Sequence, residues 1–137
     1  MEEKSLKPGL IGQAIVNVTD ENTALKFGSG TVTVFATPAM VGLMEKAAIN
    51  AVDELLPSGF ATVGTHLDIK HLAATPINMI VMAKAELIEI NGNKLIFKVE
   101  AFDEVEKIGE GFHSRYIIQL GNFLDRTNKK SEVLKNK

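Results

Sequence analysis

One helical segment is followed by a chain that is almost entirely strand. This change in the spacing of apolar residues constrains the fold more than any other feature of the sequence. Residues 37–56, TPAMVGLMEKAAINAVDELL, indicate a single helix, with Thr37 at the N-cap and Pro38 at the first helical position. The hydrophobic period then changes from 3.6 to 2, and we expect long strands over 61–72, 78–90, 94–103 and 107–120. One helix must cover a large antiparallel sheet, so the sheet should curl around it. The sequence predicts an α+β fold with a long central helix wrapped by a curved antiparallel β-sheet.

The N-terminal third has weaker signals. We expect short strands over 13–17 and 31–35, joined by a polar connection that has room for a brief strand over 24–27. Asn91 and Gly92 predict a hairpin between the second and third long strands. Gly42 costs about 1 kcal/mol relative to Ala inside the helix, which we interpret as a close approach by another backbone. The part of the sheet that one helix cannot cover predicts pairing with a second subunit, and hence a homodimer.

Size and composition exclude several classes of protein. The 137 residues suit one domain over 1–137, with residues 121–137 as a C-terminal tail that is partly helical or frayed. A net charge of −2 gives no basic field for nucleic acid, although the tail through Lys137 is locally basic. The chain has no cysteine and no metal-ligand spacing. Its start carries Glu2, Glu3 and Lys4, and no run approaches membrane-spanning length, so we expect a cytoplasmic protein without a signal peptide, membrane segment or metal.

Glu45 is a carboxylate at a helical position where an apolar residue is expected. Its neighbours three and four positions away are Val41, Gly42, Ala48 and Ile49. The nearest edge of the polar stripe, Asp53, lies about 80° away around the helix. Burying an unpaired carboxylate costs several kcal/mol, so Glu45 either extends to water or has a partner or a chemical role.

Strand parity places a histidine on the apolar side of the first long strand. Val63, Leu67 and His71 should point one way, and Thr62, Gly64 and His66 the other. A single histidine at such a position is more often a satisfied core residue than a functional one. His66 fits an ordinary surface residue, and His113 on the last strand faces water or a groove.

Thr37, Glu45 and His71 together have the functional groups that acyl transfer needs. A carboxylate in an apolar setting can act as a nucleophile or general base, and an imidazole can move a proton. A helix N-terminus presents unpaired N–H groups that can polarise a thioester carbonyl. The sequence does not decide whether the three side chains meet, and Thr37 could serve only as a cap.

Several motifs resemble one branch of a known family. They are Phe35-Ala36-Thr37, residues 40–45 (MVGLME), Gly64-Thr65, residues 71–76 (HLAATP) and residues 111–115 (GFHSR). In this order they are similar to the fluoroacetyl-CoA thioesterase-like branch of the hotdog-fold family, over residues 35–120. The resemblance implies a long helix wrapped by an antiparallel sheet, and a dimer in which the sheets join and the sites lie between subunits.

The resemblance also implies residue roles. Thr37, Glu45 and His71 would form the catalytic set, in which Glu45 attacks or directs water at the thioester carbonyl. Gly64 would lie where the backbone approaches the acyl group, and Arg115 would contact the CoA portion of an acyl-CoA substrate, with no further cofactor. Thr31 stands where the fluoroacetyl-specific enzymes carry an aromatic lid residue, so we expect another short acyl group. The alternatives are a non-catalytic acyl-CoA-binding module and a hotdog dehydratase or isomerase acting on acyl thioesters.

Overall fold

The computed structural model describes residues 5–135, so the charged residues Glu2, Glu3, Lys4 and Lys137 lie outside the described part. In chain order the elements are β1 (Ile11–Asn17), the 3-10 turn η1 (Asp20–Asn22), α1 (Ala24–Phe27), α2 (Thr37–Val52), η2 (Asp53–Leu55), β2 (Phe60–His71), β3 (Ile80–Asn91), β4 (Lys94–Phe102), β5 (Lys107–Gln119) and α3 (Leu120–Lys135). The long helix and the four long strands therefore form close to where the periodicity predicts them.

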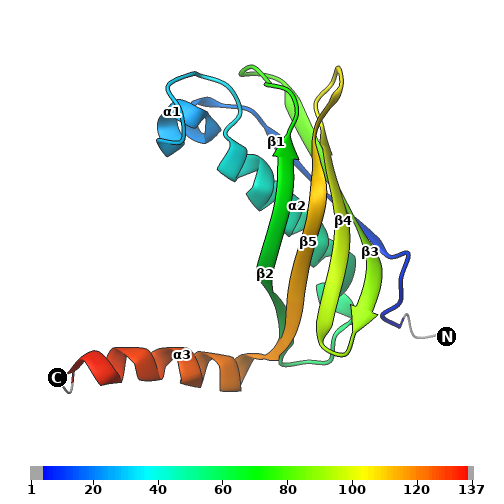
Figure 1. The fold of residues 1–137 in the computed structure, drawn as a ribbon, viewed down its shortest axis with the longest axis vertical. Helices are drawn as coiled ribbons and strands as arrows, with labels where there is room; N and C mark the ends of the chain where they lie inside the picture. Colours follow the sequence, from blue (N-terminus) through cyan, green and yellow to red (C-terminus); the bar gives the residue numbers. More distant parts are fainter. Residues whose placement is uncertain (1–4, 136–137) are drawn as a thin grey trace.

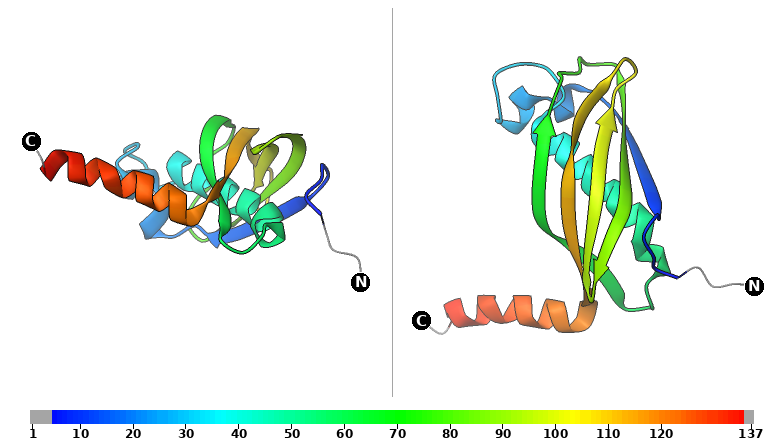
Figure 2. Two further views of the ribbon diagram at one scale, coloured as in Figure 1. Left: turned by 90° about the horizontal axis from the view of Figure 1, so that it is seen from below. Right: turned by 45° about the vertical axis from the view of Figure 1, so that its right-hand side comes forward.

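All strands belong to one antiparallel sheet that curls around α2 (Figure 1 and Figure 2). The strand order is β1-β3-β4-β5-β2, so β2 pairs with β5 and not with β3, its neighbour in sequence. Met40, Met44 and Ala48 on α2 are fully buried, against alternating residues of β3 and β4 such as Leu87 and Phe97. The predicted arrangement of a helix enclosed by a curved sheet is confirmed, and β2 is one free edge of that sheet.

The prediction of strands over 24–27 and 31–35 is wrong. Residues 24–27 form the short helix α1, because the Thr23 hydroxyl caps it by accepting a hydrogen bond from Lys26 N–H and Gly28 ends it at φ 78°. Residues 31–35 make only the isolated bridges Thr23↔Phe35 and Val34↔Pro76. Local capping thus prevails over the β propensity of this segment.

The close backbone contact of α2 occurs at a different glycine from the predicted one. At Gly42 an added Cβ would meet nothing within 4 Å, so the interpretation of Gly42 as a contact point is wrong for one chain. At Gly12 on β1 an added Cβ would overlap the backbone of Ala47 and Ala51 in α2. The backbone of β1 can pack directly against the backbone of α2 because Gly12 has no side chain.

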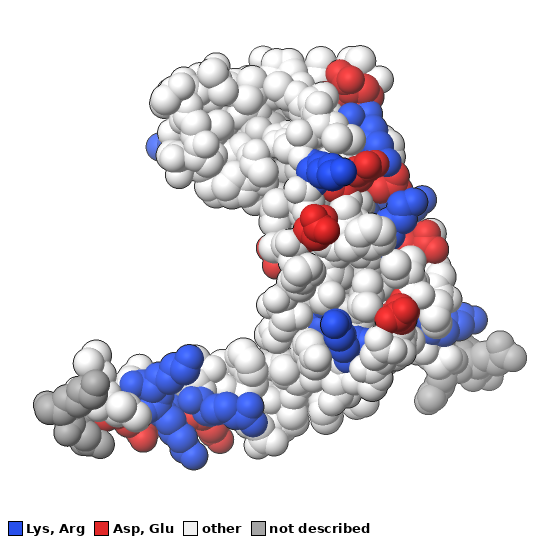
Figure 3. All heavy atoms as spheres, in the orientation of Figure 1, with Lys and Arg blue, Asp and Glu red and all other residues white. Residues whose placement is uncertain are grey.

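The helix α3 leaves the body of the molecule at the end of β5 and projects beyond the β2 edge (Figure 1). Lys and Arg side chains gather on α3, whereas few charged side chains appear around α1 on the face that Figure 3 shows. Among the described residues, no helix combines the length and apolar character needed to cross a bilayer.

Candidate active site

The start of α2 brings Thr37 and His71 together. Ala36, not Thr37, is the N-cap of α2, and Thr37 is the first helical residue, followed by Pro38. The prediction that Thr37 caps the helix is therefore wrong, and its Oγ1 lies 2.7 Å from His71 Nδ1 instead. The first backbone hydrogen bond of the helix runs from Met40 N–H to Ala36 O, so the N–H groups of Thr37 and Ala39 point out of the helix start.

His71 has one nitrogen engaged and one nitrogen free to act. Its Nε2 is buried and has no hydrogen-bond partner among residues 5–135. Burial lowers the pKa of His71, and a contact with the Ala73 backbone partly offsets this effect. The imidazole is therefore neutral at neutral pH, and a buried Nε2 without a partner can accept a proton or bind a ligand.

A cavity of about 380 Å³ opens beside Thr37 and His71. Small and apolar residues make up most of its wall, and the loop after α1 supplies one side. The lining residues are Ala24, Ser29, Gly30, Val32, Val34, Phe35, Thr37, His71, Leu72, Ala73 and Ala74. Such a wall suits an apolar group better than a charged one.

Glu45 lies in a second cluster, with Gly64 and Arg115. Its Oε2 is 3.8 Å from the Nη1 of Arg115, and an added Cβ at Gly64 would stand 2.9 Å from it. The Glu45 side chain is 36% exposed, so it is not the dry carboxylate that the helical spacing suggests for a single chain. It lies beside Gly64, which is on the edge strand β2.

Arg115 is buried in a polar network that sequence reasoning missed. Its Nε donates to Thr62 Oγ1 at 2.8 Å and its Nη2 to Thr62 O at 2.9 Å. The Thr62 hydroxyl in turn donates to Asp53 Oδ1 at 2.6 Å. Arg115 is only 4% exposed, so its predicted contact with CoA stays a prediction, and its described position is beside Glu45. The available signal was a single arginine within the apolar alternation of the last strand.

His113 completes this network, and it is fully buried. Its Nδ1 lies 2.8 Å from His66 O, and because a carbonyl can only accept, Nδ1 carries the proton. Its Nε2 therefore accepts from Arg115 Nη1 at 3.1 Å. Burial lowers the pKa of His113, which agrees with a neutral ring. The alternative that His113 faces water is wrong.

A bulge in β2 explains why the parity prediction fails at Thr62 and Gly64. The register of β2 against β5 shifts between Gly64 and His66. The extra residue reverses the alternation, so that Thr62 and Gly64 lie on the same side of the sheet as His71. Both clusters therefore face α2.

Within one chain the two clusters remain far apart. Gly64 and His71 are separated by seven residues of one strand, about 23 Å at the usual rise per residue. Thr37 and Glu45 are eight residues apart on α2, about 12 Å along the axis. The structure thus joins Thr37 to His71 and Glu45 to Gly64 and Arg115, but it does not bring Glu45 to His71.

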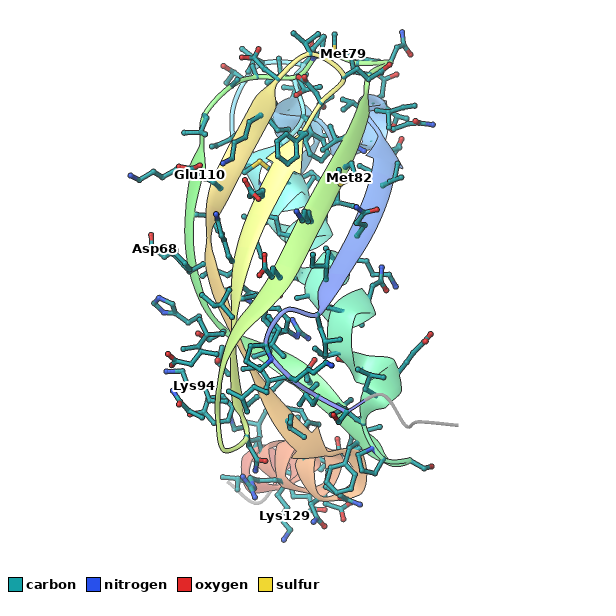
Figure 4. The ribbon with its side chains drawn as sticks, turned by 90° about the vertical axis from the view of Figure 1, so that its right-hand side faces the viewer. Asp68, Met79, Met82, Lys94, Glu110 and Lys129 are labelled. Atoms are coloured by element: carbon teal, nitrogen blue, oxygen red, sulfur yellow. The ribbon has the colours of Figure 1, made fainter. Side chains whose placement is uncertain are left out.

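A second hollow, also of about 380 Å³, lies on the outer face of the sheet. Asp68 and Glu110 point outward there from β2 and β5 (Figure 4). Lys107 forms ion pairs with Glu100 at 2.8 Å and with Glu110 at 2.6 Å, so ion pairs occupy part of the rim of this hollow. None of the predicted catalytic residues lines it. Within residues 5–135 no three His, Cys, Asp or Glu side chains lie close enough to hold a metal ion.

Known proteins share this architecture and much of this sequence. The family described as fluoroacetyl-CoA-specific thioesterase matches residues 18–120. The fluoroacetyl-CoA thioesterase of Streptantibioticus cattleyicolor is 41% identical over 98 residues, which are 72% of this chain and 70% of that protein. A solved structure of a fluoroacetyl-CoA thioesterase has a TM-score of 0.87 at 32% identity, covering 93% of this chain and 98% of the other. A thioesterase superfamily member from Thermus thermophilus has a TM-score of 0.88 at 26% identity, covering 96% and 97%.

The curved antiparallel sheet around one long helix is the hotdog fold, in the form that thioesterases of this superfamily share. Within that class, the chain belongs to the fluoroacetyl-CoA-specific thioesterase family. It is a thioester hydrolase.

Proposed function

We propose that this protein hydrolyses short-chain acyl-CoA thioesters at a site shared between two copies of the chain. Thr37 and His71 come from one copy, and Glu45, with Gly64 and Arg115 beside it, comes from the other. The observation that carries the proposal is the separation of the two clusters in one chain, together with the buried Nε2 of His71 that lacks a partner within the described residues.

Pairing of the free β2 edges would close the gap between the clusters. Two β2 strands can add to each other as an antiparallel pair around a two-fold axis. If the axis passes near Leu67 and Asp68, the Gly64–Thr65 bulge of one copy lies beside Lys70 and His71 of the other. Glu45, which is next to Gly64, then reaches the Thr37 and His71 end of the second copy.

The groups in the combined site match the steps of thioester hydrolysis. The free N–H groups at the start of α2 polarise the thioester carbonyl. Glu45 acts on the carbonyl carbon, either directly or through a water that it deprotonates, and the C–S bond breaks. When Nδ1–H of His71 donates to Thr37 Oγ1, Nε2 carries the lone pair and can take up and return the proton. The products are the free acid and CoA.

A panel of short acyl-CoAs tests the activity through release of free thiol. We expect Glu45→Ala and His71→Ala to lower kcat by about 10²–10⁴-fold while the proteins stay folded. Thr37→Ala should lose less, because the imidazole keeps its place in the wall. A protein that binds acyl-CoA but hydrolyses it no faster than Glu45→Ala would be a binding module, and dehydration or isomerisation of the acyl group would indicate the other alternative.

Mixing inactive variants tests the shared site. A heterodimer of Glu45→Ala and His71→Ala has one site with both substitutions and one site that is entirely wild type. After random re-assortment about a quarter of the wild-type activity should return, because half of the dimers carry one intact site out of two. A site that is complete within one chain would give no recovery.

A further inference from the structure

The helix α3 carries an apolar stripe that the described chain leaves uncovered. Its side chains Leu120, Phe123, Leu124 and Leu134 fall on one side of the helix at 100° per residue, with Thr127 and Ser131 between them, and none of its residues is buried. Leu124 is 51% exposed and Leu134 74%. An isolated helix of this length is marginal in water, so α3 requires a surface that covers this stripe.

The body of the same chain does not supply that surface. α3 continues from β5 and projects away from the sheet (Figure 1). The family match ends at residue 120, where α3 begins, whereas the solved thioesterase structures cover 93% and 96% of this chain and so extend into α3.

A second copy brings a complementary surface to α3. This step rests on the β2 pairing proposed above. In one chain α1 and α3 both project past the β2 edge, at opposite ends of the strand, and they overlap in the view from below (Figure 2). A two-fold axis near the middle of β2 exchanges these ends, so α3 of one copy comes to α1 of the other. At about 1.5 Å per residue α3 extends about 24 Å, which is enough to cross α1 and the loop after it.

The surface at α1 is apolar and exposed. Leu25 is 55% exposed, Phe27 53% and Val32 55%, and the face of this region that Figure 3 shows carries few charges, although Lys26 of α1 is exposed. The same loop forms a wall of the cavity at Thr37 and His71, because Ser29, Gly30 and Val32 line it. Whatever covers Leu25, Phe27 and Val32 therefore also holds one wall of the acyl pocket.

We propose that α3 is an arm exchanged between subunits: its apolar stripe packs on Leu25, Phe27 and Val32 of the second copy and closes the outer side of that copy's acyl pocket. A second copy of this chain thus covers both exposed apolar surfaces, the stripe on α3 and the surface at α1. The arm would fix the loop that borders the substrate and exclude water from it.

Crosslinking tests the contact directly, since the natural chain has no cysteine. Leu124→Cys and Phe27→Cys chains are mixed, allowed to exchange subunits and treated with a short bismaleimide. We expect a covalent dimer in the mixture and almost none with either chain alone, because a two-fold axis keeps identical arms at opposite ends. Val133→Cys, on the far side of α3, replaces Leu124→Cys as the control. Crosslinking of Leu124→Cys with itself, or no crosslink in a mixture that does exchange, would overturn the proposal.

A charge on the stripe tests what the arm does. We expect Leu124→Glu to weaken the dimer about tenfold or more, as loss of a central apolar contact does, and to raise KM more than it lowers kcat. Val133→Glu should match the wild type in dimer affinity and in KM. If Leu124→Glu has the same dimer affinity and KM as Val133→Glu while the wild type is an active dimer, the proposal of an exchanged arm is wrong and the proposed function stands. If the wild type is an inactive monomer, the proposed function fails first.

Discussion

At the residue scale, Gly64 controls the space in front of Glu45. A Cβ there would stand 2.9 Å from Glu45 Oε2 and 3.1 Å from His113 Cε1. We expect Gly64→Ala to lower kcat/KM about tenfold or more, because displacement of a reacting group by a fraction of an ångström has such effects. The melting temperature should fall only modestly, because the end of the Glu45 side chain can move, although the buried His113 ring must also shift by a few tenths of an ångström. A variant with wild-type kcat/KM would mean that this space is not used.

The buried imidazoles predict how stability depends on pH. Burial lowers the pKa values of His71 and His113 in the folded chain, whereas in the unfolded chain each titrates near about 6.5. Below that pH the unfolded state binds more protons, so the free energy of unfolding should fall as the pH falls, and should be flat above it. Urea unfolding at several pH values measures this.

The same measurement on His113→Gln separates the contributions of His71 and His113 to the pH dependence of stability. The amide of Gln can still pair with Arg115 but does not titrate, so the decline toward acid pH should become shallower even if the plateau is lower. An unchanged slope would contradict the assignment of His113 as a neutral, buried ring.

At the element scale, the contact of β1 with α2 depends on Gly12. A Cβ at this position would overlap backbone atoms of Ala47 and Ala51. A change of side-chain rotamer cannot relieve this overlap, because the atoms belong to the helix backbone. We expect Gly12→Ala to cost about 1–3 kcal/mol of unfolding free energy or more, as overpacking does. Gly42→Ala is the matched comparison, because its Cβ meets open space in the chain and Ala favours helix. Equal stability of the two variants would contradict this account of the packing.

The β4–β5 turn is tied to the β2–β3 connection by Asp103. Its Oδ1 accepts from the N–H groups of Val105 and Glu106, and its Oδ2 accepts from the hydroxyl of fully buried Thr75. Burial acts to raise the pKa of Asp103, but these hydrogen bonds together lower it. We expect Asp103→Ala to cost about 1–3 kcal/mol, because the Thr75 hydroxyl loses its partner. Chemical denaturation measures this, and Thr75→Val in the same background should then cost little more.

At the scale of the whole molecule, the proposed dimer predicts that stability depends on protein concentration. Subunit association stabilises only the folded state, so the melting temperature should rise with concentration. Leu67→Asp places added negative charge near the proposed axis, beside Asp68 of both copies, and should shift light scattering toward the monomer. Val105→Asp serves as the control, because it lies in the exposed β4–β5 turn, beyond the end of β2 and eight residues from His113, the β5 partner of Leu67 near the proposed axis. A wild type that stays monomeric at micromolar concentration would refute the shared site.

The sequence alone determined the long helix, the four long strands and the kinds of chemistry available. The change from a period of 3.6 to a period of 2 after residue 56 gives one helix and then strands, because each pattern buries its apolar side only in that conformation. Asn91 and Gly92 give the β3–β4 hairpin, with Gly92 at φ 61°. These features depend on neighbours in sequence, and they were predictable for that reason.

Tertiary structure decided where the functional side chains lie. The bulge after Gly64 turns Thr62 and Gly64 toward α2, and the pairing of β2 with β5 leaves β2 as an edge. The Thr37–His71 hydrogen bond and the distance of Glu45 from it follow from that placement. Such features depend on contacts between residues far apart in sequence, whose free energies arise only when the whole sheet has closed around the helix, so no local pattern contains them.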